Sequence, residues 1–219
     1  MEHRLSQQEA RRIAVRAQRL DAPRPADLLE LVAHLGALRV DLTAAVAPCA
    51  EMTCWSRLGS RFTGEDLDAL LVDRSLVEFG GFLRPGADMA LYRAQMRDWP
   101  GRGPLRDWQA GNGEWVQAND ACREDLLQRL RSEGPLPARE LPDSCVVPWR
   151  STGWTNDRNV MKLLEFMEQR GEVAVSSREG NERSWDLAER VYPDGPAVPA
   201  DEALVAREER RLTALGIVR

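Results

Sequence analysis

The alternation of apolar and polar positions predicts a helical start to the chain. Ser6 and Glu9 have the spacing of a capping box, and the apolar stripe behind them predicts a helix running to about Leu20. The segment DAPRP then breaks the pattern. A second helix is predicted to open at Pro25 and to stop at Gly36.

The stretch LGALRVDLT, which follows the second helix, has the period of a short strand. Its apolar residues alternate with Arg39 and Asp41, so these two side chains are expected side by side on the face opposite the core. The simplest interpretation is an exposed ion pair that contributes about 0–1 kcal/mol.

Further helices and one strand are predicted before the middle of the chain. Apolar spacing indicates a helix over residues 44–57 and another opened by Thr63 or Gly64. The segment SLVEFGGFL has the character of a strand that ends at a glycine pair. Glycine and proline are frequent over residues 99–114, which favours a boundary between two units there.

The second unit has a regular order of elements. NDACREDLLQRLRSEGP predicts a helix, LPARELP a short second helix and TNDRNVMKLLEFMEQRG a third. EVAVSS and RSWDLAE then alternate on either side of REGNE, which indicates a β-hairpin. Three helices followed by a two-stranded wing is the winged-helix arrangement, in which the third helix lies in the DNA major groove.

These elements predict a mainly α fold with small β-hairpins, an α+β class built of tandem winged-helix units. The expected divisions are a winged-helix-like unit, a linker, a second winged-helix unit and a C-terminal helix, over residues 1–98, 99–114, 115–195 and 196–219.

Several side chains of the second unit suit contacts with phosphates and base edges. The third helix and the wing offer Thr155, Asn156, Arg158, Asn159, Lys162, Arg178, Asn181 and Arg183. The alternative is a solvated face on a winged helix used for packing.

Composition limits the class of protein. With 43% hydrophobic and 30% charged residues the chain is typical of globular proteins, and it has neither a membrane-length apolar run nor a signal peptide, so we expect a cytoplasmic protein without a membrane partner. The four cysteines lack zinc-ligand spacing and are expected to be free thiols, with no metal bound. A net charge of -5 opposes simple coating of nucleic acid but permits a local basic face.

Segments spread over nearly the whole chain resemble the winged-helix DNA glycosylases that include AlkZ and YcaQ, which unhook interstrand crosslinks and remove alkylated bases. The matching segments are LSQQEARRIAVRAQRL, LVAHLGALRVD, SRLG, LDALL, LVEF, WVQAN and RGEVAVSSREGNERSWDLAERVYP. The resemblance implies double-stranded DNA as the partner, no cofactor, and Arg57 of SRLG as a further DNA-binding residue.

The resemblance also places the catalytic motif at Arg39-Val40-Asp41, where the family carries glutamine, a hydrophobic residue, then aspartate or glutamine. Asp41 would orient the attacking water as general base and oppose the charge that develops on the sugar. Arg39 departs from the pattern. A guanidinium there would pair with the carboxylate and repel a cationic sugar or base.

Other departures keep the function open. Pro48-Cys49-Ala50 replaces an Arg-Ala-His stretch, and the chain stops one helix into the family's third unit. The alternatives are an active glycosylase that hydrolyses the N-glycosidic bond, a catalytically impaired DNA-binding or regulatory protein, and a protein-interaction module. The sequence does not settle the lesion preference or the oligomeric state.

Overall fold

Helices surround one antiparallel sheet in the computed structural model, which describes residues 5–41, 46–150 and 158–217. This arrangement confirms the predicted α+β class with mainly helical content. No helix in these described ranges is both long enough and apolar enough to cross a membrane.

The first part of the chain forms four α-helices, a 3-10 turn and three short strands. They are α1 (Gln7–Ala17), α2 (Leu28–Leu35), β1 (Leu38–Arg39), α3 (Cys49–Leu58), η1 (Gly59–Arg61), α4 (Gly64–Val72), β2 (Leu76–Phe79) and β3 (Phe82–Pro85). The capping box of Ser6 and Glu9 is present at α1, and Gly36 ends α2 with φ +77°.

The rest of the chain adds helices on either side of a second hairpin. Its elements are η2 (Gly86–Leu91), α5 (Arg93–Arg97), α6 (Asp107–Ala118), α7 (Asp120–Glu133), β4 (Leu136–Pro137), η3 (Ala138–Glu140), α8 (Asn159–Gln169), β5 (Val173–Glu179), β6 (Glu182–Leu187), α9 (Ala188–Val191) and α10 (Ala200–Leu215). The predicted hairpin and the final helix are both confirmed.

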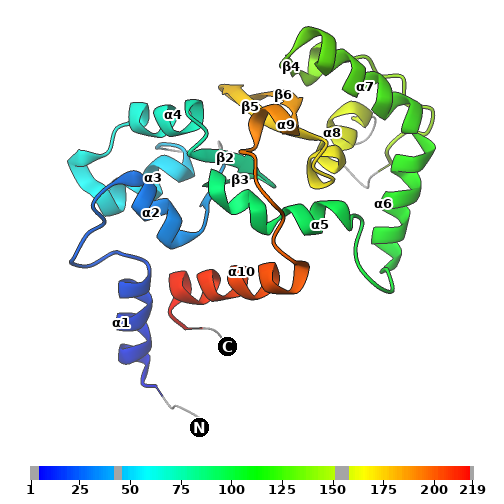
Figure 1. The fold of residues 1–219 in the computed structure, drawn as a ribbon. Coiled ribbons are helices and arrows are strands. Elements are labelled where there is room, and N and C mark those ends of the chain that lie inside the picture. Colours follow the sequence, from blue (N-terminus) through cyan, green and yellow to red (C-terminus); the bar gives the residue numbers. More distant parts are fainter. Residues whose placement is uncertain (1–4, 42–45, 151–157, 218–219) are drawn as a thin grey trace.

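One six-stranded sheet joins the two predicted units. Its order is β1-β3-β2-β5-β6-β4, and every neighbouring pair is antiparallel. The hairpin β2–β3 meets the hairpin β5–β6 where Glu78 pairs with Val175. Figure 1 shows α2, α3 and α4 beside one end of this sheet and α6, α7 and α8 beside the other.

Three groups of buried side chains hold the elements together. One lies among α6, α7, α8 and the hairpin β5–β6, and a second among α2, α3, α4 and the hairpin β2–β3. The third lies at the junction, where Val77 and Phe79 of β2 pack with Ala174 of β5 and with Val191 and Tyr192. Burial of this shared apolar surface fixes the two hairpins relative to each other.

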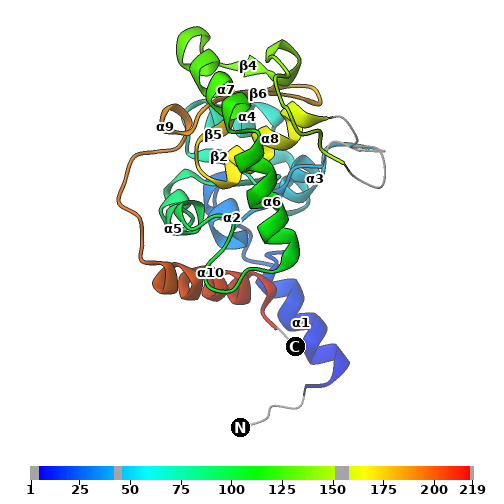
Figure 2. The same cartoon turned by 90° about the vertical axis from the view of Figure 1, so that its right-hand side faces the viewer.

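The last helix, α10, lies across the N-terminal part of the molecule (Figures 1 and 2). It contacts α2, η2, α5 and α1. The Gln18 side-chain amide donates a hydrogen bond to the carbonyl of Ala214, and Gly216 approaches Ile13 and Ala17 so closely that a Cβ there would lie 2.7 Å from the Ala17 Cβ. The C-terminal helix therefore packs on the first part of the chain.

The structure differs from the sequence prediction in several local elements. Residues 107–114 of the expected linker are helical, as the start of α6. LPARELP forms β4 and the 3-10 turn η3 instead of a helix, because Leu136 and Pro137 pair with β6. The strand predicted to end at the glycine pair does so, as β2, but the pair is also a hairpin turn that leads into a second strand, β3, which the pattern did not predict. Asp27 caps α2 in place of the expected start at Pro25.

Candidate active site and DNA interface

Arg39 and Asp41 lie at the outer edge of the sheet. Leu38 of β1 is buried, whereas Arg39 is exposed, and the Val40 amide donates to the Gly81 carbonyl at 3.0 Å. The predicted alternation is confirmed, although only Leu38 and Arg39 have strand geometry. Arg39 Nη2 lies 3.4 Å from Asp41 Oδ2, and the two side chains are 67% and 36% exposed.

A groove of about 830 Å³ brings this edge together with the second half of the chain. Its charged lining consists of four arginines and three carboxylates, namely Arg39, Arg158, Arg178, Arg183, Asp41, Glu165 and Glu182. Asn181 at the hairpin tip also lines it. Asp41 and Arg158, which are more than 115 positions apart in the sequence, therefore line the same groove.

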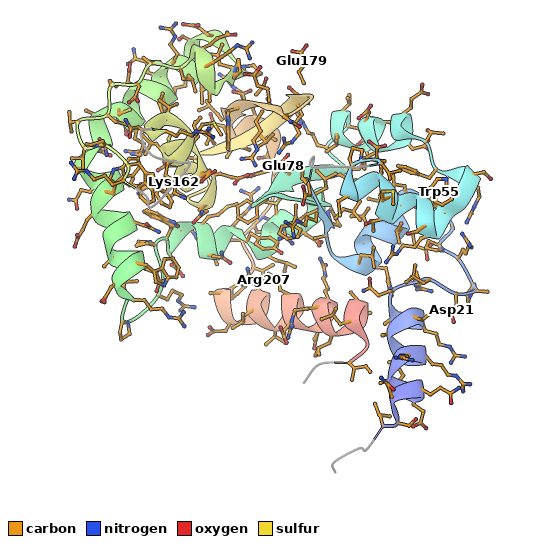
Figure 3. All side chains as sticks on the ribbon, turned by 180° about the vertical axis from the view of Figure 1, so that it is seen from behind. Asp21, Trp55, Glu78, Lys162, Glu179 and Arg207 are labelled. Atoms are coloured by element: carbon orange, nitrogen blue, oxygen red, sulfur yellow. The ribbon has the colours of Figure 1, made fainter. Side chains whose placement is uncertain are left out.

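A buried glutamate on β2 holds the groove arginines of the hairpin. Arg178 donates from Nε and Nη2 to the two carboxylate oxygens of Glu78, both at 2.6 Å, and Arg183 Nε lies 3.6 Å from Glu78 Oε1. Glu78 is only 4% exposed. Figure 3 shows Glu78 in the middle of the molecule, between the two groups of helices. The bidentate pair therefore holds the hairpin β5–β6 against the hairpin β2–β3.

A second buried carboxylate, Glu168 of α8, lies behind this pair. Burial, together with the nearby charge of Glu78, raises the pKa of Glu168 to about 8, whereas Arg183 acts in the opposite direction. Oε1 of Glu168 is buried and has no hydrogen-bond partner in the described part of the chain. Near neutral pH this carboxyl group is therefore mostly protonated.

Sequence reasoning missed Glu78 and Glu168. Glu78 is a charged residue inside the apolar stretch LVEF, and a charge in such a stretch indicates a buried partner, whereas Glu168 precedes the polar residues Gln169 and Arg170 and gives no such signal. The partner could not be named from the sequence, because Arg178 follows Glu78 by 100 residues.

Three of the side chains predicted to contact DNA have partners within the protein. Arg57 is 8% exposed, and its guanidinium donates to Gln18, Thr53 and Ser56. Arg57 of SRLG therefore ties α3 to Gln18 at the end of α1.

The side chains of Asn159 and Lys162 also contact other groups of the protein. The Asn159 side chain accepts from the Trp149 amide at 2.7 Å and donates to Asp143 at 2.9 Å. Lys162 Nζ lies 4.6 Å from the Phe166 ring centroid and 3.1 Å from Glu165. Arg158, Arg178 and Arg183 line the groove. Thr155 and Asn156 lie outside the described residues.

The four cysteines are free, as predicted. Cys122, Asp143 and Cys145 nevertheless have ligand atoms within 4.8 Å of one another, although Cys122 and Cys145 are far apart in the sequence. Burial, and the hydrogen bond to Cys122, raise the pKa of Cys145.

Comparison with known proteins identifies the family. Residues 32–219 match the family described as DNA glycosylase AlkZ-like. This chain belongs to the AlkZ-like DNA glycosylase family. The match includes the strand that carries Arg39 and Asp41, and both hairpins of the groove.

A solved structure, that of Streptomyces sahachiroi DNA glycosylase AlkZ, shares the fold. The TM-score is 0.68 at 17% sequence identity, over 98% of this chain and 58% of the Streptomyces protein. The chain thus spans little more than half the length of that AlkZ-like glycosylase.

Proposed function

We propose that this chain is a DNA glycosylase that hydrolyses the N-glycosidic bond of alkylated or crosslinked bases in double-stranded DNA. Membership of the AlkZ-like family supports the reaction class. The observation that carries the proposal is the groove in which Asp41 faces arginines of the second half. A carboxylate beside cationic groups is suited to a reaction on a polyanion.

The proposed chemistry uses Asp41 to orient a water molecule. Cleavage of the bond between base and sugar leaves positive charge on the sugar, and water attacks the anomeric carbon as the base departs. Asp41 takes the proton of that water and opposes the sugar's charge. An alkylated purine is already cationic, so its departure needs no strong general acid.

The groove arginines supply the proposed grip on the duplex. Arg158 is exposed, and Arg183 is 26% exposed at its side chain. Guanidinium groups bind phosphates through paired N–H donors. We expect Arg158→Gln to weaken duplex binding about equally for all sequences and to reduce its salt dependence by about one phosphate contact.

The Arg39–Asp41 ion pair favours a second candidate function. Arg39 forms an ion pair with the carboxylate of Asp41, the group that would hold the water. This pairing suits a catalytically impaired DNA-binding or regulatory protein. The pair is exposed, so exchanging it for a phosphate contact costs only about 0–1 kcal/mol. The two functions therefore differ in what Arg39 does when DNA is bound.

Base release from DNA that contains an alkylated purine tests both functions. We expect the wild-type chain to release base, Asp41→Asn to lose this activity by about 100-fold or more, and Arg39→Gln to increase it. The matched control is Arg16→Gln, because Arg16 and Asp21 form another exposed pair at 3.4 Å.

Each outcome assigns the function. Activity in Arg39→Gln alone would show that the arginine blocks a competent site. No release by any variant, together with salt-dependent duplex binding, would favour the DNA-binding protein. Equal release by wild type and Asp41→Asn would overturn the role of Asp41.

A further inference from the structure

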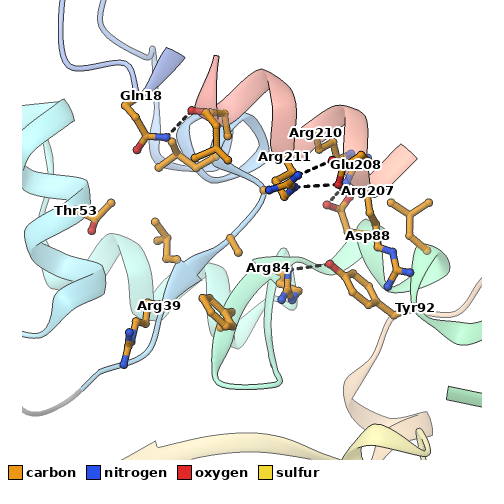
Figure 4. Close-up of a pocket in the computed structure, with 18 of the residues that line it drawn as sticks. Gln18, Arg39, Thr53, Arg84, Asp88, Tyr92, Arg207, Glu208, Arg210 and Arg211 are labelled. Atoms are coloured by element: carbon orange, nitrogen blue, oxygen red, sulfur yellow. Dashed lines mark hydrogen bonds and ion pairs between the residues drawn. The ribbon is translucent and has the colours of Figure 1, made fainter. Parts of the chain in front are cut away.

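A second hollow of about 640 Å³ lies between α10 and the edge of the sheet. It is bordered by α10 on one side and by β1, β3 and η2 on the other, with Arg39 at its margin (Figure 4). We call it the arginine cavity. Its volume is within the range of about 300–1,000 Å³ that is typical of small-molecule sites.

Positive charge exceeds negative charge in the lining of the arginine cavity. Six arginines and two carboxylates line it, namely Arg39, Arg57, Arg84, Arg207, Arg210, Arg211, Asp88 and Glu208. Three of these arginines come from one helix, α10, at positions that repeat with its turn. Such an excess of guanidinium groups attracts an anion.

Most of these arginines have a partner that satisfies them. Arg210 pairs with Asp88, and Arg211 makes a two-bond contact with Glu208. Arg57 donates to carbonyl and hydroxyl groups, and Arg39 pairs with Asp41.

Arg84 and Arg207 share one aromatic ring as a partner. In the part of the chain that the structure describes neither pairs with a carboxylate, and their guanidinium carbons lie 4.8 and 4.9 Å from the centroid of the Tyr92 ring, while Arg207 also donates to the side-chain oxygen of Gln95. Arg84 Nη1 donates to the Tyr92 hydroxyl at 2.8 Å, but its Nε is buried without a hydrogen-bond partner. A buried donor without an acceptor is unfavourable, so the Arg84 guanidinium keeps unused hydrogen-bonding capacity.

Apart from Gln18 and Thr53, the remaining side chains of the lining are apolar or aromatic. Leu35, Leu38, Leu91 and Leu204 contribute aliphatic surface, and the Phe82 ring is 37% exposed. A ligand that fits therefore carries an anionic group at one end and a flat apolar part at the other. We propose that the arginine cavity binds a mononucleotide, with its phosphate on Arg84 and the arginines of α10 and its base against the apolar wall.

Calorimetric titration of the 219-residue chain with AMP, adenosine and inorganic phosphate tests the proposal. We expect AMP to bind more tightly than either of its parts, because only AMP reaches both ends of the cavity. Arg84→Gln and Arg207→Gln should each weaken AMP binding about 10-fold or more. Arg207 is on a surface helix, so its substitution leaves the fold intact even where Arg84→Gln does not.

The matched control is Arg129→Gln, which removes an exposed arginine of α7 that does not line the cavity. It should bind AMP as the wild type does. The proposal is overturned if AMP does not bind, if adenosine binds as tightly as AMP, or if Arg207→Gln changes only the affinity for DNA. Loss of AMP binding in Arg158→Gln but not in Arg207→Gln would move the site to the groove and also overturn it. None of these outcomes depends on base release.

Discussion

At the scale of single residues, the positions of the groove arginines depend on two buried carboxyl groups. Glu78 gives both its oxygens to Arg178, while Glu168, close by, is uncharged for most of the range around neutral pH. Two ionised carboxylates in one buried site would repel each other. Protonation of Glu168 relieves that repulsion and leaves Glu78 free to hold the arginines.

Glu168 makes stability depend on pH. Its pKa rises from an ordinary value of 4.5 to about 8 on folding, so between these values the folded chain binds more protons than the unfolded chain. The free energy of unfolding should therefore fall as pH rises from about 5 to 8, by up to ~1.4 kcal/mol for each unit of pKa difference. Glu168→Gln should flatten this dependence and be the more stable protein at pH 8.

Urea unfolding at several pH values measures this effect. Glu165→Gln is the matched control, because Glu165 lies on the same helix but is 40% exposed at its side chain. It should keep the wild-type slope between pH 5 and 8. If Glu168→Gln and wild type show the same slope, Glu168 is not the group that titrates.

At the scale of elements, the ion pair of Glu78 with Arg178 joins the two hairpins in addition to the apolar packing at their junction. Glu78 on β2 and Arg178 on β5 join strands that are otherwise connected by few backbone bonds, since the two strands share only the pair of Glu78 with Val175 in register. The pair of Glu78 and Arg178 holds the hairpin β5–β6 in the orientation in which Arg178 and Arg183 line the groove.

Removing Glu78 should be costly. Glu78→Gln leaves Arg178 without its charge partner in a largely buried site, and we expect the free energy of unfolding to fall by on the order of 3 kcal/mol. Glu179→Gln, at an exposed position near the tip of the same hairpin, should change it by less than ~0.5 kcal/mol. Chemical denaturation of both variants makes the comparison. Equal free energies of unfolding for Glu78→Gln and Glu179→Gln would show that the hairpin β5–β6 is held by apolar packing alone.

At the scale of the whole molecule, the last helix packs against the first part of the chain. The helix α10 packs across α2 and η2 and reaches α1, so residues separated by about the full length of the chain are in contact. This packing is also what closes the arginine cavity, because α10 supplies one of its walls. The cavity therefore lies between the last helix, α10, and the edge of the sheet that carries Arg39.

A charge placed under α10 should detach it. Ala203 is 1% exposed, so Ala203→Glu buries a carboxylate without a partner, whereas Val205→Glu places one at a position that is 57% exposed. We expect amide hydrogen exchange in residues 200–215 to accelerate in Ala203→Glu and to stay unchanged in Val205→Glu. Unchanged exchange in both variants would mean that α10 is held by its ends rather than by this face.

The sequence by itself determined the local elements and the family. Capping residues, glycine stops and the periods of apolar residues act over a few positions, so they predicted α1, α10, the hairpin β5–β6 and the exposed pair of Arg39 and Asp41. Shared segments in a common order then identified the AlkZ-like glycosylases.

The tertiary structure decided which of the candidate side chains meet. Arg57 and Asn159 suit DNA by residue type, but their side chains bond to Gln18 and to Trp149, and no local pattern reveals these contacts. Lys162 contacts Glu165 and Phe166 of its own helix. Glu78 reaches Arg178, and α10 reaches η2, only because the sheet continues from one hairpin to the next and the last helix folds back. Contacts at such separations depend on packing of the whole chain, which periodicity along the sequence does not record.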